Sequence, residues 1–222
     1  MNRPRVIVFD VNQTLSDLAP LADRFGEVGA PPELATAWFA GLLRDGFALS
    51  TTGETAAFAD IARAELEWVL RPVLGDEALP DAVRHVLDGL GSLDLHPDVV
   101  DGVRALRNRD IELVTLSNGA ASVAEGLLER AGIRDQFSRL LSVEDAGVWK
   151  PAARAYQHAL SECGVAADEA MLVAVHPWDI HGAARAGLRT AWLNRNGAAF
   201  PSHFAEPDLS SVSLVGLAAA LG

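Results

Sequence analysis

The sequence predicts an α/β fold in which a parallel sheet is interrupted by a helical insertion. Short apolar runs rich in β-branched residues recur along the chain and alternate with helix-patterned stretches. Such alternation is typical of a parallel sheet covered by helices. About a hundred residues without a convincing strand separate the first apolar run from the second, which indicates an inserted helical block.

The predicted strands are continuous apolar runs, as expected for strands buried on both faces. In chain order they span residues 5–9, 112–116, 140–143, 171–175 and 190–193. The helix-patterned stretches between them span residues 98–108, 121–131, 152–162 and 180–186. Residues 198–208 have a loop-like composition, and a closing helix is expected over residues 211–221.

The insertion is expected to form a separate helical cap domain. Its helices are predicted at residues 18–28, 32–45, 54–70 and 80–90, with breaks at Gly29-Ala-Pro-Pro32 and Gly75-Asp76. The sequence thus predicts a core domain of residues 1–17 and 94–222 and a cap domain of residues 18–93. The cap is expected over the carboxyl edge of the sheet, where open α/β sheets bind ligands.

Charge and composition exclude several classes of function. The net charge of -12 disfavours nucleic acid and anionic membranes as partners, although a locally positive cleft can still bind a small anionic substrate. The single cysteine, Cys163, rules out an intrachain disulfide. No run of 18 apolar residues occurs, and the N-terminal stretch resembles a strand more than a signal peptide, so we expect a cytoplasmic protein.

Polar residues follow four of the predicted strands, where each strand ends. They form the motifs Asp10-Val-Asn-Gln-Thr14, Ser117-Asn118-Gly119, Lys150-Pro151 and His176-Pro-Trp178-Asp179. Because parallel strands end at a common edge, these side chains are expected in one cleft. No metal ligand set is expected among them.

The residue types in these motifs suit covalent catalysis. A carboxylate such as Asp10 can attack carbon or phosphorus and form a covalent intermediate. The hydroxyls of Thr14 and Ser117 can hold its oxygens or those of the substrate. Lys150 would keep the clustered acids ionised, since a nearby cation favours the charged form. Asp179 can pair with Lys150 or position the water that cleaves the intermediate.

The order of these motifs resembles the haloacid dehalogenase superfamily over essentially the whole chain. The resemblance implies a Rossmann-like parallel-sheet core with an inserted cap, and Asp10 as the nucleophile. Phosphatases of this superfamily usually carry an acid two residues after the nucleophile and bind Mg²⁺ through acids of the fourth motif. Here those positions hold Asn12 and Val175. A phosphatase therefore stays the second hypothesis, and only that hypothesis implies Mg²⁺.

The 2-haloacid dehalogenase branch, which needs no cofactor, is more similar. The matching stretches are Leu116-Ser-Asn-Gly119, Lys150-Pro151 with Tyr156, Trp178-Asp179 with Gly182-Ala183, and Trp192-Leu-Asn-Arg195. The resemblance implies that Asp10, Thr14, Ser117, Lys150 and Asp179 are catalytic. It implies a substrate- or halide-binding set of Asn12, Trp38, Phe39, Asn118, Tyr156, His176 and Trp178. Members of the branch commonly pair, which implies a homodimer.

Two departures from this branch bear on substrate binding. The family places a halide-accepting arginine directly after the cap tryptophan, where this chain has Phe39. Arg44 lies five residues further along, about 140° around a helix, and is no simple replacement. In the fourth motif, Ala174 and His176 stand where the family has serine and asparagine.

The function predicted from the sequence is hydrolysis of the carbon–halogen bond of small 2-haloacids through an aspartyl ester. A catalytically silent binding protein, supported by Phe39 and Ala174, is the third hypothesis. Several assignments have a structural alternative. These are Thr14 and Ser117 as turn hydroxyls, Lys150 as a surface lysine, Tyr156 as packing, Trp38 and Phe39 as packing within the cap, Asn118 as a turn residue, and His176 as a residue that shapes the loop before Pro177.

Overall fold

A computed structural model describes residues 3–222, and the chain divides into two compact units. One unit comprises the chain up to Ser16 together with Asp94–Gly222, and the other comprises Asp17–Leu93. The sequence had placed the first boundary after residue 17 and the second after residue 93. The second unit is helical and is inserted after the first strand. Its action as a cap stays a prediction.

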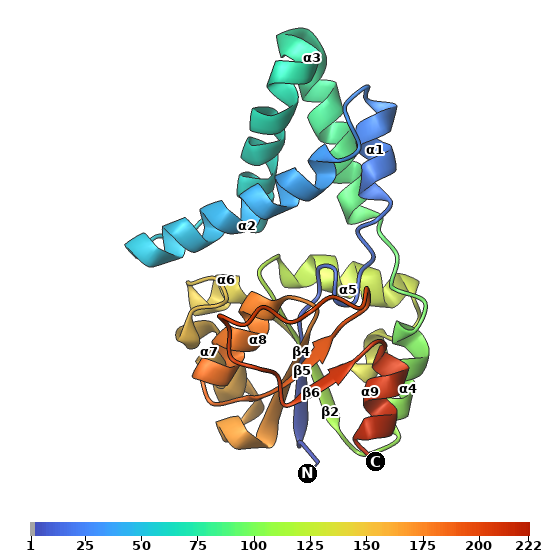
Figure 1. The fold of residues 1–222 in the computed structure, drawn as a ribbon, viewed down its shortest axis with the longest axis vertical. Coiled ribbons are helices and arrows are strands. Elements are labelled where there is room, and N and C mark those ends of the chain that lie inside the picture. The colour runs from blue at the N-terminus through green and yellow to red at the C-terminus, as the bar shows by residue number, and fades with distance from the viewer. Residues whose placement is uncertain (1–2) are drawn as a thin grey trace. The chain divides into compact units, whose positions relative to one another are not determined.

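The larger unit is built on a parallel sheet, as the sequence predicted (Figure 1). Within residues 3–222 the sheet has six strands in the order β3-β2-β1-β4-β5-β6. Each neighbouring pair is parallel, so all strands end at the same edge. The strands are β1 (Val6–Phe9), β2 (Glu112–Ser117), β3 (Arg139–Ser142), β4 (Ala170–Ala174), β5 (Arg189–Leu193) and β6 (Leu209–Ser211).

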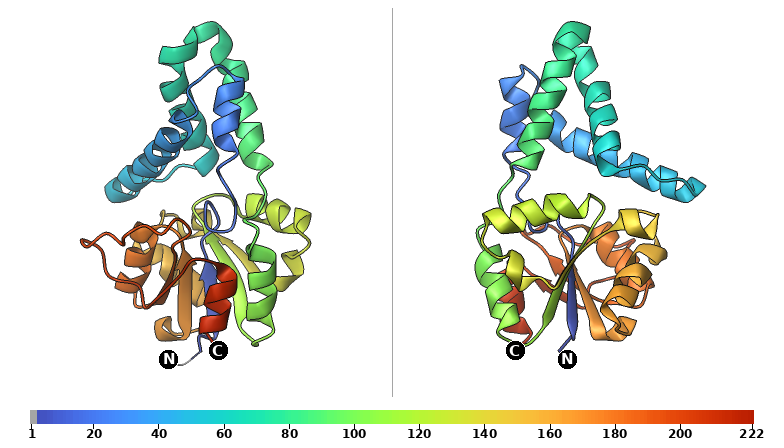
Figure 2. Two further views of the ribbon diagram at one scale, coloured as in Figure 1. Left: turned by 45° about the vertical axis from the view of Figure 1, so that its right-hand side comes forward. Right: turned by 180° about the vertical axis from the view of Figure 1, so that it is seen from behind.

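Helices cover both faces of this sheet, which explains the continuous apolar runs of the central strands. Figures 1 and 2 show α4 and α9 on one side of the sheet and α7 and α8 on the other. Ile7 and Phe9 of β1 share a buried cluster with residues of α4 and α9. The helices of this unit are α4 (Val99–Arg107), α5 (Ala121–Arg130), α6 (Val143–Ala146), α7 (Ala153–Cys163), α8 (Pro177–Arg185) and α9 (Leu214–Ala220), with short 3-10 turns at Arg134–Gln136 and Ala167–Glu169.

The helical unit contains α1 (Leu21–Glu27), α2 (Leu34–Thr52) and α3 (Phe58–Gly91). Its core is apolar and includes Phe25, Trp38 and Leu66, all fully buried. The sequence predicted two helices where the structure has α3, and the predicted break coincides with a kink at Gly75, whose φ is 73°. Within residues 3–222, no helix has both the length and the apolar character needed to cross a membrane.

Two details of the core unit differ from the sequence prediction. Strand β3 ends at Ser142, because its hydroxyl accepts a hydrogen bond from the Glu144 N–H and starts α6, so Val143 is helical. Strand β6 was not predicted, since three residues with a polar Ser-Ser end carry no apolar run. The last helix begins at Leu214 because Ser213 caps it through the Gly216 N–H.

Gly102 in α4 tests how closely this helix packs against α9, and Gly126 in α5 serves as the control. A methyl group on Gly102 would lie 2.6 Å from Leu214 Cγ and 2.9 Å from its backbone carbon, whereas one on Gly126 would meet only Arg130 Nη1, at 3.4 Å. We therefore expect Gly102→Ala to lower the free energy of unfolding by about 1–3 kcal/mol through overpacking. Gly126→Ala should raise it by about 0.5–1 kcal/mol through helix propensity.

Urea titrations of the two variants measure both effects. A stabilising Gly102→Ala, or equal changes in the two variants, would contradict this account of the contact between α4 and α9.

Candidate active site

The candidate site lies at the carboxyl edge of the sheet, where the strand order reverses. Asp10 directly follows β1, which pairs with β2 on one side and β4 on the other. Ser117 closes β2, and Val175 and His176 follow β4. In doubly wound sheets, this switch point is where ligands bind. The topology thus brings together motifs that are far apart in the sequence.

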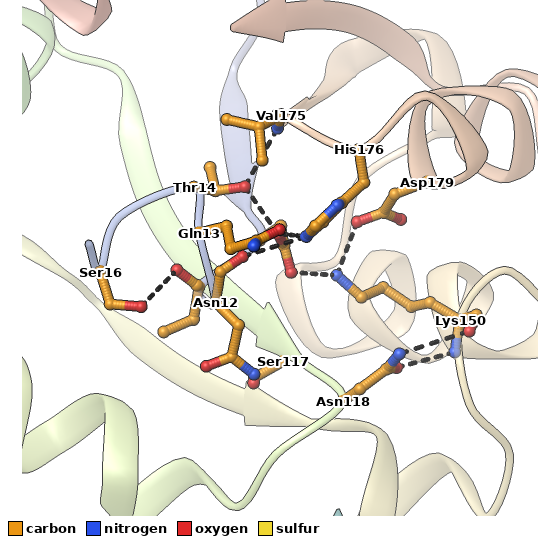
Figure 3. Close-up of polar contacts among 12 residues, drawn as sticks. Asn12, Gln13, Thr14, Ser16, Ser117, Asn118, Lys150, Val175, His176 and Asp179 are labelled. Carbon is orange, nitrogen blue, oxygen red and sulfur yellow. Dashed lines mark hydrogen bonds and ion pairs between the residues drawn. The ribbon is translucent and has the colours of Figure 1, made fainter. Parts of the chain in front are cut away.

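The centre of the site is Lys150, the single lysine of the chain. Its Nζ lies 2.9 Å from Asp10 Oδ1 and 2.7 Å from Asp179 Oδ2 (Figure 3). The side chains of Lys150 and Asp179 are 0% exposed, and that of Asp10 is nearly buried. Charges this deeply buried are tolerated only when they are paired and hydrogen bonded.

This pairing fixes which groups are ionised. Burial by itself would raise the pKa of Asp10, but Lys150, His176 and the Thr14 hydroxyl together hold it below its ordinary value. Burial works against a charged Lys150, yet the two carboxylates raise its pKa. For Asp179, burial and the nearby Asp10 raise the pKa despite the contact with Lys150. Asp10 is therefore the acid of the pair that stays ionised more readily, as a nucleophile must.

Tyr156 supports the second carboxylate and is the single tyrosine of the chain. Its hydroxyl donates to Asp179 Oδ1 at 2.6 Å. Burial and the Asp179 charge raise the pKa of Tyr156 well above its ordinary value, so it remains a neutral donor. Both oxygens of Asp179 are thus engaged, one by Lys150 and one by Tyr156. Tyr156 is more than packing, because it holds the acid that in turn holds Lys150.

Thr14 holds the second oxygen of Asp10. Its hydroxyl donates to Asp10 Oδ2 at 2.6 Å and accepts from the Val175 N–H at 3.1 Å. The loop folds back in this way because Gln13 adopts a left-handed conformation, with φ at 63°. The two oxygens of Asp10 therefore have different partners, Lys150 for Oδ1 and Thr14 for Oδ2.

The motif Ser117-Asn118-Gly119 fixes the backbone around Lys150. Asn118 Oδ1 accepts from the Lys150 backbone N–H at 2.9 Å, and Asn118 Nδ2 lies 3.4 Å from the Lys150 carbonyl. The Ser117 hydroxyl accepts from the Gly119 N–H at 2.9 Å. Both residues are buried in the site. The expected contacts of Asn118 with a halide and of Ser117 with a substrate carboxylate stay predictions.

The imidazole of His176 also lies beside Asp10. Its Nε2 lies 3.6 Å from Asp10 Oδ2 and 3.2 Å from the Asn12 carbonyl oxygen (Figure 3). The imidazole stacks on Trp178 with ring centres 5.0 Å apart and planes 20° apart. The structure therefore gives His176 contacts with both Asp10 and the loop that follows it. Asn12 takes part through its backbone carbonyl.

The remaining candidate residues belong to the helical unit. Trp38 donates its indole N–H to the Ala62 carbonyl and packs against Phe25, so it is a core residue of that unit. Phe39 is also buried and lies edge-on to Trp38. Arg44, considered above as a replacement for the family arginine, pairs with acids of the helical unit itself. The contribution of Trp38 and Phe39 to a substrate pocket stays a prediction.

The sequence motifs do not include two side chains that hold the loop after Asp10. Arg195 donates to the Thr14 carbonyl at 2.9 Å, and His96 Nε2 lies 2.9 Å from the Gln13 carbonyl oxygen. Arg195 was noted only as part of a matching stretch, without a role. His96 follows the helical insertion and has no spacing that points to the site. A side-chain motif does not reveal contacts with backbone carbonyls, because every residue type has a carbonyl.

The arrangement suits nucleophilic catalysis by a carboxylate. Within residues 3–222, no group of three or more His, Cys, Asp or Glu side chains is placed to hold a metal ion. A family model for haloacid dehalogenase-like hydrolases matches residues 4–187. The chain therefore belongs to the haloacid dehalogenase-like hydrolases and is a hydrolase.

Several relatives that are similar to the chain over most of its length are named as dehalogenases. The chain is 30% identical to an (S)-2-haloacid dehalogenase of Pseudomonas sp. strain YL over 211 residues, 94% of this chain and 90% of the other. It is 27% identical to haloacetate dehalogenase H-2 of Moraxella sp. strain B, covering 95% and 94% of the two chains. A crystal structure of an L-2-haloacid dehalogenase superposes with a TM-score of 0.89, at 27% identity and 99% coverage of each chain.

Removing the ammonium group tests its hold on the two acids. In Lys150→Met, Asp10 and Asp179 would face each other in a buried site, so we expect unfolding to require about 3–5 kcal/mol less at pH 7. The folded-state pKa values of both acids would then lie above their unfolded values. The loss in the free energy of unfolding therefore has its full size above the folded-state pKa. It becomes smaller as the pH falls through that value, because the acids are then protonated. The variant should therefore recover stability relative to wild type in acid.

Urea titrations between pH 7 and pH 4 check this expectation. Adding Asp10→Asn to Lys150→Met removes one of the two charges and should restore part of the loss at pH 7. A loss in Lys150→Met that is the same at both pH values would show that Lys150 contributes packing alone.

Proposed function

We propose that the chain hydrolyses the carbon–halogen bond of small 2-haloacids through an ester of Asp10. The observation that carries the proposal is the state of Asp10: an ionised, nearly buried carboxylate whose two oxygens are held by Lys150 and Thr14. Relatives named for the dehalogenation of 2-haloacids and haloacetate, over nearly the whole chain, support the choice of substrate.

In the first step, a carboxylate oxygen of Asp10 attacks the halogen-bearing α-carbon from the side opposite the halogen. The new carbon–oxygen bond forms as the carbon–halogen bond breaks, and the halogen leaves with the bonding pair as halide. Lys150 and Thr14 fix the direction of the attacking oxygens, so the nucleophile is already oriented before the substrate reacts. Lys150 also offsets the charge of Asp10 and Asp179, which lowers the electrostatic cost of bringing an anionic substrate to Asp10.

In the second step, water attacks the carbonyl carbon of the Asp10 ester. The ester carbon–oxygen bond on the carboxyl side breaks, which releases a 2-hydroxyacid and restores the carboxylate. One proton is released to solvent per turnover, and the Nε2 of His176 lies 3.6 Å from Asp10 Oδ2, beside the ester that the water attacks. Asp179 acts here through Lys150, because Tyr156 and Lys150 occupy its two oxygens.

This reaction needs no cofactor in our proposal. Halide departs as a stable anion, so the leaving group requires no general acid. A hard divalent cation would bind through carboxylate oxygens, and Lys150 already joins the two carboxylates of the site. Asn12 and Val175 further reduce the acids available to a phosphatase.

Replacing the nucleophile gives the direct test. Wild type should release halide from 2-chloropropionate or from fluoroacetate. Asp10→Asn should lose at least about 1,000-fold in kcat because the attacking group is gone. A halide-selective electrode measures the release. A single turnover in H₂¹⁸O should place the label in Asp10, detectable by mass spectrometry of the peptide.

Two results would contradict the proposal. Absence of halide release from every haloacid would remove the assigned activity. Magnesium-dependent release of phosphate from p-nitrophenyl phosphate would instead favour the phosphatase hypothesis.

The pH dependence of kcat/KM provides an independent prediction. Asp10 must be ionised to attack, and its pKa is held below the ordinary aspartate value of about 3.9. The acid limb of kcat/KM should therefore fall below that value, with activity retained as long as the chain stays folded. Circular dichroism at each pH separates the two effects. An acid limb near pH 6 would show that Asp10 is not the group whose ionisation limits the rate.

A further inference from the structure

The loop that carries Asp10 is held by side chains that the proposed chemistry does not use. Three consecutive carbonyls of this loop, those of Asn12, Gln13 and Thr14, each have a nitrogen partner from a different segment. Their partners are His176 Nε2 at 3.2 Å, His96 Nε2 at 2.9 Å and Arg195 Nη2 at 2.9 Å. A carbonyl can only accept, so each nitrogen donates. His176 also approaches Asp10, but His96 and Arg195 contact only the backbone of the loop.

The loop needs such external contacts because its conformation is unfavourable by itself. Gln13 has a φ of 63°, and a non-glycine residue in this region costs about 1–2 kcal/mol. Strain of this kind persists when the surroundings determine the conformation. The hydrogen bonds to the carbonyls of Gln13 and Thr14 hold the loop in this conformation.

Arg195 is the better anchored of the two residues. Its Nη1 lies 2.7 Å from Asp98 Oδ1, and Asp98 Oδ2 accepts from the Leu214 N–H at 2.6 Å. Asp98 immediately precedes α4 and Leu214 begins α9, the two helices that cover one face of the sheet. Burial would raise the pKa of Asp98, but the Leu214 N–H and Arg195 lower it, so the pair stays ionised. The planar guanidinium thus joins a helix-anchored carboxylate to the nucleophile loop.

A continuous set of contacts leads from this anchor to the nucleophile. Arg195 binds the carbonyl of Thr14, and the hydroxyl of the same residue donates to Asp10 at 2.6 Å. We propose that Arg195, assisted by His96, is a positioning residue for Asp10: it holds the loop carbonyls so that the Thr14 hydroxyl stays on the carboxylate. Only the turnover measurement below rests on the proposed function.

The inference predicts two linked effects that a purely structural arginine would not produce. Without Arg195, the loop can relax, and Asp10 loses a well-aligned hydrogen bond while Lys150, His176 and Asp179 still face it. Its apparent pKa should then rise. The attacking oxygen should also be misplaced, and a displacement of the order of 1 Å can cost about 100-fold in rate. The loss should appear in kcat more than in KM, because the contacts with substrate remain.

The test compares Arg195→Gln, Arg195→Lys and His96→Phe with the control Arg134→Gln. Arg134 is a matched control because it also joins a carboxylate, Glu125 at 3.2 Å, to a backbone carbonyl, that of Phe137 at 2.9 Å, in another part of the core unit. The first readout is kcat and KM for halide release. The second needs no activity: with ¹³C-labelled lysine, the single Lys150 side chain, 2.9 Å from Asp10, reports the titration of Asp10 in NMR spectra. Asp10→Asn identifies the step that belongs to Asp10.

We expect Arg195→Gln to lower kcat by about 10- to 100-fold, with a smaller change in KM. The Asp10 titration should move to higher pH, Arg195→Lys should recover part of both effects, and His96→Phe should show the same changes to a smaller extent. Arg134→Gln should change neither readout, whatever its effect on stability. If Arg195→Gln does not fold, Arg195→Lys and His96→Phe decide the outcome.

The inference would be overturned if the Arg195 and His96 variants behaved like Arg134→Gln, with wild-type kcat and an unmoved titration. Should wild type release no halide at all, the proposed function would fail by itself. The position of the Asp10 titration in the variants would still support or overturn the inference.

Discussion

The ammonium group of Lys150, buried between two carboxylates, is the constraint around which the rest of the site is organised. Two acids in the interior of a protein cannot both ionise without a compensating cation, and a buried cation is equally costly without acids. Each of the three charges is therefore stable only in the presence of the others. This mutual dependence fixes the distances of 2.9 Å and 2.7 Å that place Asp10 at the sheet edge as an ionised group.

The neighbouring residues maintain this arrangement from several directions. Asn118 holds the backbone of Lys150, Tyr156 holds Asp179, and Thr14 holds the second oxygen of Asp10. Each of these contacts comes from a different strand end or helix, so the site depends on the register of the parallel sheet. The strand order, which reverses around β1, is what allows segments separated by more than a hundred residues to meet at one carboxylate.

Departures from the family pattern occur beside Asp10 and in the helical unit, and they leave the charged centre unchanged. His176 stands where the family has an amide, and the structure places it against Asp10, the Asn12 carbonyl and the ring of Trp178. An imidazole at this point can carry positive charge, which an amide cannot. Phe39 replaces the family arginine, and it is buried in an apolar environment beside Trp38. The chain thus belongs to the family although it lacks the arginine of the family pattern at Phe39 and has a histidine in place of an amide at His176.

The sequence by itself determined the α/β class, the helical insertion and the four motifs, because local apolar patterns and strand-end polar residues are properties of short segments. It predicted Asp10, Thr14, Lys150 and Asp179 as one group, and the structure brings them together. Only the tertiary structure showed that Asn118 binds the Lys150 backbone, and that His96 and Arg195 hold the loop carbonyls. The strand β6 also became visible only there. These features depend on hydrogen bonds with backbone atoms of distant segments, and every residue type provides such atoms, so no side-chain pattern in the sequence records them.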